Sequence, residues 1–185
     1  MKITETNIEG LLIIEPSVFN DSRGYFYESY NKIKFKEARI AADFVQDNES
    51  FSHKGATRGL HAQADPFAQG KLVRVISGRV LDVAVDIRKG SATYGKHVSV
   101  ELSGDNKLQL WIPAGFLHGF ATLEDNTIFT YKVNNYYDKA SEIGVLWNDP
   151  TLAIDWGIAP GDVLLSPKDE LLPTFDSFVS PFDRD

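Results

Sequence analysis

Short stretches in which apolar and polar residues alternate, with turn residues between them, restrict the fold of this chain most strongly. The alternation is clearest in 81–88, 97–102 and 107–112, where every second residue is Leu, Val or Ile. A period of two is the signature of a β-strand with two different faces. Many short strands separated by turns are typical of an antiparallel sandwich or barrel. The sequence therefore predicts a mainly β fold.

Helix is scarce in the pattern. Residues 32–42 form the best candidate helix, and Asn31 is a suitable cap for its start. The C-terminal third carries most of the prolines, so we expect short helices or loops that pack against the barrel. With 185 residues, 43% of them hydrophobic, the chain is long enough for one sizeable core. No repeat or linker interrupts it, and we expect a single domain over residues 1–185.

The composition excludes some classes of function. A net charge of −7 disfavours general nucleic-acid binding, although a local cationic pocket can still bind a small anion. The chain has no cysteine, which excludes thiolate catalysis and zinc–thiolate sites. Its N-terminal apolar run, 11–14, is too short for a signal peptide, and no stretch approaches the roughly 18 apolar residues of a membrane span. We expect a cytoplasmic protein without a membrane or nucleic-acid partner.

Three ionisable residues lie on predicted strands in positions from which their side chains could face the barrel interior. Alternate residues of a strand face opposite sides, so Lys71 shares a face with Val73, and Tyr131 shares one with Phe129. If the apolar faces point inward, both polar groups lie inside the barrel. His61, at the end of the segment Arg58-Gly59-Leu60-His61, joins them at the cavity wall on the same assumption.

Each of these residues also has an ordinary structural explanation. Lys71 could end at the barrel mouth beside an acid, Tyr131 could be a core tyrosine, and His61 could be a hydrogen-bonded structural histidine. Together, however, a base and a cation in one enclosed cavity suit proton abstraction next to a carbonyl group. His118, which follows Pro113-Ala114-Gly115, is the second histidine that we place near this cavity.

Several motifs occur in an order that is typical of one family. The segment 113–118 resembles the Pro-x-Gly-x-x-His element of cupins. The further matching segments are 19–30, 46–48, 58–61, 69–75, 82–88, 109–113, 115–120 and 131–132 with 136–137. They run from about residue 10 to about residue 170, nearly the whole chain. On these motifs the chain resembles the dTDP-4-dehydrorhamnose 3,5-epimerases.

The resemblance implies a cupin-type jelly-roll barrel with a few short helices, acting as a homodimer without a metal or organic cofactor. It implies inversion of C3 and C5 of a dTDP-4-keto-6-deoxyhexose in dTDP-L-rhamnose synthesis. His61 matches the catalytic base, Tyr131 the acid on the opposite face, Asp169 the carboxylate paired with the histidine, and Lys71 the cation near the ketone oxygen.

The resemblance also implies a set of substrate-binding residues. Cations among them suit the diphosphate, because arginine offers a bidentate fork to phosphate oxygens. Tyr137 matches an aromatic that stacks on the thymine. The other members of the set are Arg23, Glu28, Gln46, Asn48, Arg58, His118, Glu142 and Lys168.

One position departs from the family pattern, and it keeps alternatives open. The family usually has an aromatic residue directly after the catalytic histidine, where this chain has Ala62. A smaller side chain there would widen the pocket wall and alter substrate choice. The alternatives are an epimerase of one carbon only, a ketoisomerase, or a non-enzymatic cupin that binds a nucleotide sugar. A catalytic metal is disfavoured, because only His118 remains of the ligand set of metal-binding cupins.

Overall fold

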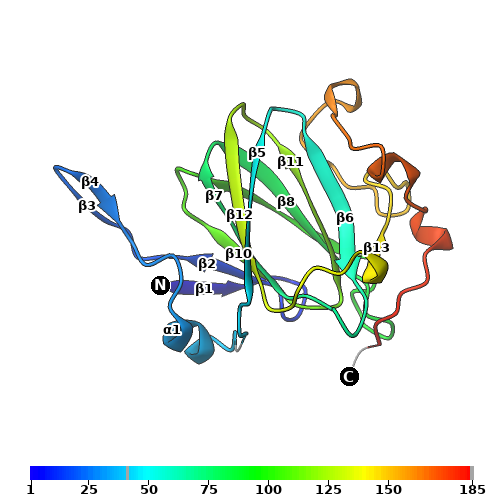
Figure 1. Cartoon of the computed structure of the whole chain (residues 1–185), viewed down its shortest axis with the longest axis horizontal. Helices are drawn as coiled ribbons and strands as arrows, with labels where there is room; N and C mark the ends of the chain where they lie inside the picture. The colour runs from blue at the N-terminus through cyan, green and yellow to red at the C-terminus, as the bar shows by residue number, and fades with distance from the viewer. Residues whose placement is uncertain (41, 184–185) are drawn as a thin grey trace.

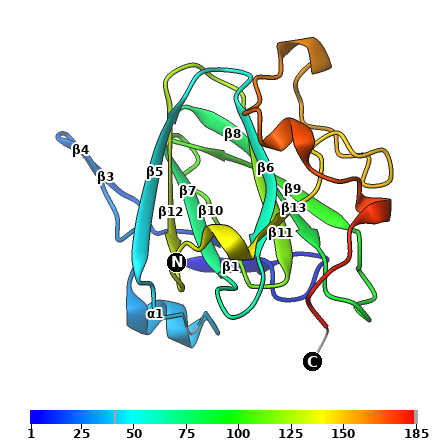
Figure 2. The same ribbon diagram turned by 45° about the vertical axis from the view of Figure 1, so that its right-hand side comes forward.

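The computed structural model describes residues 1–40 and 42–183, and within them two antiparallel sheets face each other as a barrel (Figure 1 and Figure 2). In spatial order, the first sheet consists of β1 (Lys2–Glu5), β2 (Leu12–Glu15), β10 (Gln109–Ile112), β7 (Lys71–Ser77), β12 (Thr127–Val133) and β5 (Gln46–Ser52). The second consists of β13 (Glu142–Gly144), β6 (Thr57–Gln63), β11 (Phe116–Thr122), β8 (Arg79–Asp86) and β9 (His97–Ser103). The predicted mainly β, cupin-type fold is confirmed.

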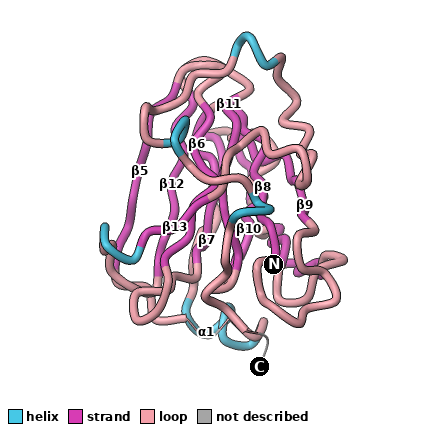
Figure 3. The backbone as a smooth tube through the Cα atoms, turned by 90° about the vertical axis from the view of Figure 1, so that its right-hand side faces the viewer, coloured by secondary structure: helices cyan, strands magenta, loops and turns pink. Residues whose placement is uncertain are grey.

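The core has an inner part and an outer part. Large apolar side chains such as Val73, Phe120 and Phe129 fill much of the space between the sheets. Val85 and Leu117 belong to a second cluster, on the outer face of the second sheet, together with residues from 145–182. Figure 3 shows this loop-rich C-terminal stretch covering that face. Burial of each such side chain contributes about 2 kcal/mol relative to exposure.

Strand β8 corrects the assumption that apolar faces point inward. Its Val83 and Val85 belong to the outer cluster, whereas Asp82 and Ala84 face the barrel interior and are fully buried. The alternation is real, but the C-terminal stretch covers the outer face of the strand. Because both faces of β8 are buried, its apolar residues do not identify the inner one.

The predicted helix is present but shorter than expected. Helix α1 spans Lys32–Glu37, and the Asn31 side chain caps its start by accepting hydrogen bonds from the Ile33 and Lys34 amides. Arg39 follows with a φ of 63°, a left-handed conformation that ends the helix. The predicted end at 41–42 includes residue 41, which lies outside the described residues.

The C-terminal third contains short 3₁₀ helices and loops, as predicted. They are η2 (Pro160–Asp162), η3 (Asp169–Leu171) and η4 (Phe175–Ser177), and η1 (Lys139–Ser141) lies just before β13. None of the helices in the described part of the chain is long and apolar enough to cross a membrane.

A hairpin projects away from the barrel (Figure 1). It is made of β3 (Phe19–Asp21) and β4 (Gly24–Phe26), which pair with each other apart from both sheets. Phe19 and Phe26 are directly paired across the hairpin and are 66% and 67% exposed. An isolated two-stranded hairpin is marginally stable in water unless its apolar face packs against another element. No such element covers Phe19 and Phe26 in the described residues, so their exposed rings are typical of an interaction surface.

Candidate active site

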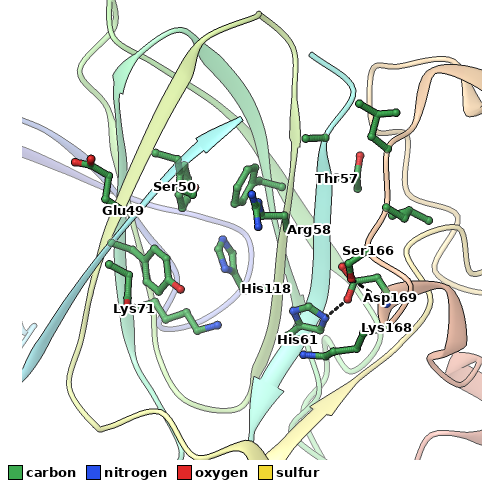
Figure 4. A pocket seen from close by; sticks show the side chains of 17 residues that line it. Glu49, Ser50, Thr57, Arg58, His61, Lys71, His118, Ser166, Lys168 and Asp169 are labelled. Atoms are coloured by element: carbon green, nitrogen blue, oxygen red, sulfur yellow. Dashed lines mark hydrogen bonds and ion pairs between the residues drawn. The ribbon is translucent and has the colours of Figure 1, made fainter. Parts of the chain in front are cut away.

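A cavity of about 620 Å³ opens between the two sheets (Figure 4). Strands β5, β6, β7, β11 and β12 contribute side chains to it, and the C-terminal stretch closes one side. Most of the predicted site residues line this cavity, namely Asn48, Arg58, His61, Lys71, His118, Tyr131, Lys168 and Asp169. Residues that are more than 100 positions apart in the sequence therefore meet in one place.

A histidine–aspartate pair forms one wall. His61 Nε2 lies 2.6 Å from Asp169 Oδ1, and this carboxylate is almost fully buried (Figure 4). Burial alone raises the pKa of Asp169, but hydrogen bonds from His61 and the Ser166 side chain, with nearby positive charge, bring it below its usual value. The ionised carboxylate holds Nε2 of His61, which leaves Nδ1 of the imidazole to accept a proton.

A β-bulge explains why Arg58 and His61 both reach the cavity although they are three residues apart. Strand β11 pairs His118 with His61 but Phe120 with Arg58, so β6 holds one extra residue between these pairs. Gly59 lies in this bulge with a φ of +120°, and a Cβ there would lie 2.6 Å from the Gly119 Cα. Simple alternation would have placed Arg58 and His61 on opposite faces.

Two cationic side chains face the cavity without a carboxylate in direct contact. Within the described residues, neither the Arg58 guanidinium nor the Lys71 ammonium forms a hydrogen bond or an ion pair. Burial lowers the pKa of Lys71 to about 8, although the negative charges of Asp82 and Glu142 partly offset this effect. Unpaired positive charge of this kind favours an anionic ligand or a developing oxyanion.

Tyr131 approaches the cavity from the other sheet. It lies on β12, whereas His61 lies on β6, so the phenol and the imidazole belong to opposing walls. Burial, only partly offset by the charge of Arg58, raises the pKa of Tyr131 above its usual value. The phenol therefore stays protonated at neutral pH and can donate its proton.

Three further predicted residues form a hydrogen-bonded rim. Glu142 accepts hydrogen bonds from Lys168 and, at 3.2 Å, from the Tyr137 hydroxyl, and it lies 4.0 Å from His61 Nδ1. Gln46 donates to Asn48 at 2.8 Å and accepts from the Tyr137 amide. Tyr137 itself is more than half exposed, as an aromatic side chain at a pocket mouth should be if it stacks on a ligand.

The structure does not bring Arg23 and Glu28 to this cavity. Arg23 lies in the turn of the projecting hairpin and pairs with Asp21 at 2.6 Å. Glu28, just after the hairpin, binds Lys34 and the Asn31 side chain. Neither residue lines the pocket of its own chain.

Ala62 does not border the cavity either. It pairs with Ile143 of β13 and packs in the outer cluster with Leu60. The missing aromatic therefore changes the packing beneath the C-terminal stretch. The expectation of a widened pocket wall is wrong.

The sequence analysis missed two charged groups in the described residues, namely Glu49, which lines the cavity from β5, and Asp82, which lies behind it. The Asp82 carboxylate is 0% exposed and lies 2.9 Å and 3.1 Å, through its two oxygens, from His118 Nε2. The alternation of 81–88 predicts that the apolar residues face inward and that Asp82 faces outward, and no local sequence feature indicates the opposite. Among the described residues, including those of this site, no three His, Asp or Glu side chains gather in a way that could hold a metal ion.

The fold and the site define a cupin-type barrel with acid–base chemistry between its sheets. A family model described as dTDP-4-dehydrorhamnose 3,5-epimerase matches residues 5–177. The chain belongs to this family and is an isomerase.

Individual relatives agree with this assignment. The dTDP-4-dehydrorhamnose 3,5-epimerase of Escherichia coli (strain K12) is 52% identical, covering 97% of each chain. A 3,5-epimerase structure from Legionella pneumophila, in complex with dTDP-4-keto-L-rhamnose, has a TM-score of 0.92 and 49% identity over 96% of this chain and 94% of that one. A 3'-monoepimerase from Streptomyces bikiniensis, in complex with dTDP-quinovose, has a TM-score of 0.86 and 34% identity over 93% and 87%.

Proposed function

We propose that this chain inverts C3 and C5 of a dTDP-4-keto-6-deoxyhexose by proton transfer between His61 and Tyr131, without a metal or organic cofactor. The observation that carries the proposal is the placement of an Asp169-bound imidazole and a protonated phenol on opposing walls of one cavity. Inversion needs this arrangement, because the new proton must arrive on the face opposite to the one that lost it.

The chemistry follows from the geometry. His61 Nδ1 takes the proton from the carbon next to the C4 ketone, and the C–H electron pair forms a carbon–carbon double bond while negative charge moves to the ketone oxygen. Lys71 and His118 stabilise that oxygen. The Tyr131 O–H then protonates the same carbon from the other face. Solvent takes the proton from His61 and restores the one on Tyr131, and the cycle repeats at the second carbon.

The remaining predicted residues bind the nucleotide part of the substrate. Arg58 and Lys168 lie at the cavity and supply positive charge for the diphosphate, while Tyr137 at the rim offers its ring to the base. Gln46, Asn48 and Glu142 are hydrogen-bonded beside them at the rim, which leaves only Arg23 and Glu28 of the predicted set away from the site of their own chain.

We propose that the protein acts as a homodimer, which would give Arg23 and Glu28 a place in substrate binding. The projecting hairpin carries Arg23 at its turn and exposes Phe19 and Phe26, which is the composition of an arm that packs on a second copy. Such an arm would bring Arg23 and Glu28 to the partner's cavity.

Replacement of both Phe19 and Phe26 by serine is therefore expected to dissociate the dimer and to weaken substrate binding by about 10-fold or more, since charged hydrogen bonds to the diphosphate are lost. Sedimentation equilibrium reports the mass, and initial rates report KM. Val179→Asp, on an 84% exposed residue of the C-terminal stretch, is the matched surface control. If the wild-type protein were a fully active monomer, the proposed role of the hairpin in dimer formation and substrate binding would be wrong.

Solvent exchange tests the reaction itself. Incubation with the dTDP-4-keto-6-deoxy sugar in deuterated water should place deuterium at both C3 and C5, because both protons pass through solvent-exchanging side chains. Mass spectrometry and proton NMR locate the label. If deuterium appeared at only one of the two carbons, the protein would instead be a monoepimerase, like the Streptomyces bikiniensis relative. A bound, unlabelled and unchanged sugar would indicate a binding protein.

A further inference from the structure

A second histidine–carboxylate pair lies beside the first one. His118 and His61 are direct cross-strand neighbours on β11 and β6, and each has its Nε2 on a buried carboxylate, Asp82 and Asp169 respectively. In the described part of the chain, Nδ1 of His118 has no hydrogen-bond partner, and Figure 4 shows the His118 ring pointing into the pocket. Because both rings use Nε2 to contact a carboxylate, both Nδ1 atoms remain available to a ligand.

We propose that Asp82 is a positioning residue for the epimerisation: it holds Nε2 of His118, so that Nδ1 is presented to the substrate, and its negative charge supports the Lys71 ammonium beside the ketone oxygen. This inference rests on the roles proposed above for His118 and Lys71. Asp82 itself does not line the cavity, so it acts through these two side chains.

The burial of Asp82 makes a structural role alone insufficient. A fully buried carboxylate is costly unless positive charge or hydrogen bonds compensate it, and an apolar residue would fill this inner position of β8 without that cost. Burial raises the pKa of Asp82, and the partial compensation comes from groups that face the pocket, namely His118 in direct contact and Lys71 through its charge. The carboxylate thus balances charges that the substrate also meets.

The arrangement suits an oxyanion intermediate. The Asp82 carboxylate lies against the His118 imidazole and its charge acts on the Lys71 ammonium, so both pocket-facing groups are held beside the position of an enolate oxygen. Without the carboxylate, the Lys71 ammonium would lose a nearby negative charge, and His118 would lose the partner of its Nε2 in an apolar environment, where Phe129 stacks on the His118 ring at 6.3 Å. The pKa of Lys71 would then fall further, and the oxyanion would lose part of its positive partner.

The variant Asp82→Asn tests the proposal, because it keeps the shape but removes the charge. We expect kcat to fall about 100-fold, the usual effect of losing one oxyanion partner, with KM changed little. The matched control is Asp86→Asn, a second fully buried carboxylate on β8 whose partners are Arg88, Ser91 and Thr93 rather than pocket residues. The folded control should keep the wild-type kcat.

The pH profile separates positioning from simple damage. Lys71, with a pKa of about 8, should set the basic limb of kcat. In Asp82→Asn that limb should move about one pH unit lower, since Asp82 no longer raises the pKa of Lys71. The other charged or titratable groups that line the cavity or act on Lys71 remain in both proteins: Glu49, Arg58, His61, His118, Tyr131, Glu142, Lys168 and Asp169.

Nitrogen-15 NMR of the wild-type imidazoles keeps the test independent of any variant's folding. His118, assigned by loss of its signal in His118→Asn, should show Nε2 as a hydrogen-bonded N–H, and its Nδ1 shift should move when the dTDP-sugar binds. Full activity of Asp82→Asn, an unmoved basic limb, or a freely exchanging Nε2 would each overturn the proposal. If His118→Asn keeps the wild-type rate, the role proposed for His118 fails instead, and the two failures are distinguishable.

Discussion

His61→Asn should remove both epimer formation and solvent exchange at C3 and C5, by about 1,000-fold or more, since a positioned general base contributes up to four orders of magnitude. Asparagine can still meet Asp169, but it cannot accept the substrate proton at neutral pH. Because the enolate then never forms, exchange fails together with inversion. Deuterium incorporation followed by NMR measures the first, and chromatographic separation of the epimers measures the second.

The comparison needs a histidine variant that leaves the site intact. His53→Asn supplies it, since the His53 side chain is 70% exposed in a loop and lies outside the cavity. Unchanged binding of dTDP to His61→Asn, by calorimetry, would show that the pocket persists. If His61→Asn exchanged deuterium at the wild-type rate, another group would be the base, and the assignment of the His61–Asp169 pair would be wrong.

Local pattern and chemistry predicted a β sandwich or barrel and part of its cavity. Strand parity placed Lys71 and Tyr131 on inward faces because the apolar residues beside them, such as Val73 and Phe129, fill the barrel interior. The places of Asn48, Arg58, Lys168 and Asp169 in the site, in contrast, came through the family resemblance alone. The stretch that holds Lys168 and Asp169 is irregular, and no periodicity relates it to His61.

Three features could not be predicted because they depend on tertiary contacts. The C-terminal stretch buries the outer face of β8, which reverses the inner and outer sides expected for Asp82 and Val83. The bulge at Gly59 shifts the register between Arg58 and His61, and local alternation carries no sign of it. The position of Arg23 in the turn of a hairpin that pairs apart from both sheets depends on how that hairpin leaves the barrel, which local pattern does not encode.

Tyr131→Phe should give a different defect from His61→Asn, and the contrast between the two variants identifies the acid. The variant keeps the ring in its place next to Phe129 but removes the O–H from the cavity wall. His61 can still remove the proton, and Lys71 and His118 can still stabilise the oxyanion. Exchange of deuterium should therefore continue, whereas the inverted product should fall by about 100-fold or more, the scale of a general acid.

Retention of configuration in the labelled sugar is the decisive readout. When the acid on the far wall is missing, the enolate is reprotonated from the near wall by His61, whose proton has exchanged with solvent, so deuterium enters without inversion. Tyr94→Phe, on a ring that packs against Phe175 away from the cavity, is the matched control and should behave as wild type. Wild-type inversion by Tyr131→Phe would show that another donor, such as a water molecule, supplies the proton. A parallel loss of exchange and inversion would mean that the phenol also helps to remove the first proton.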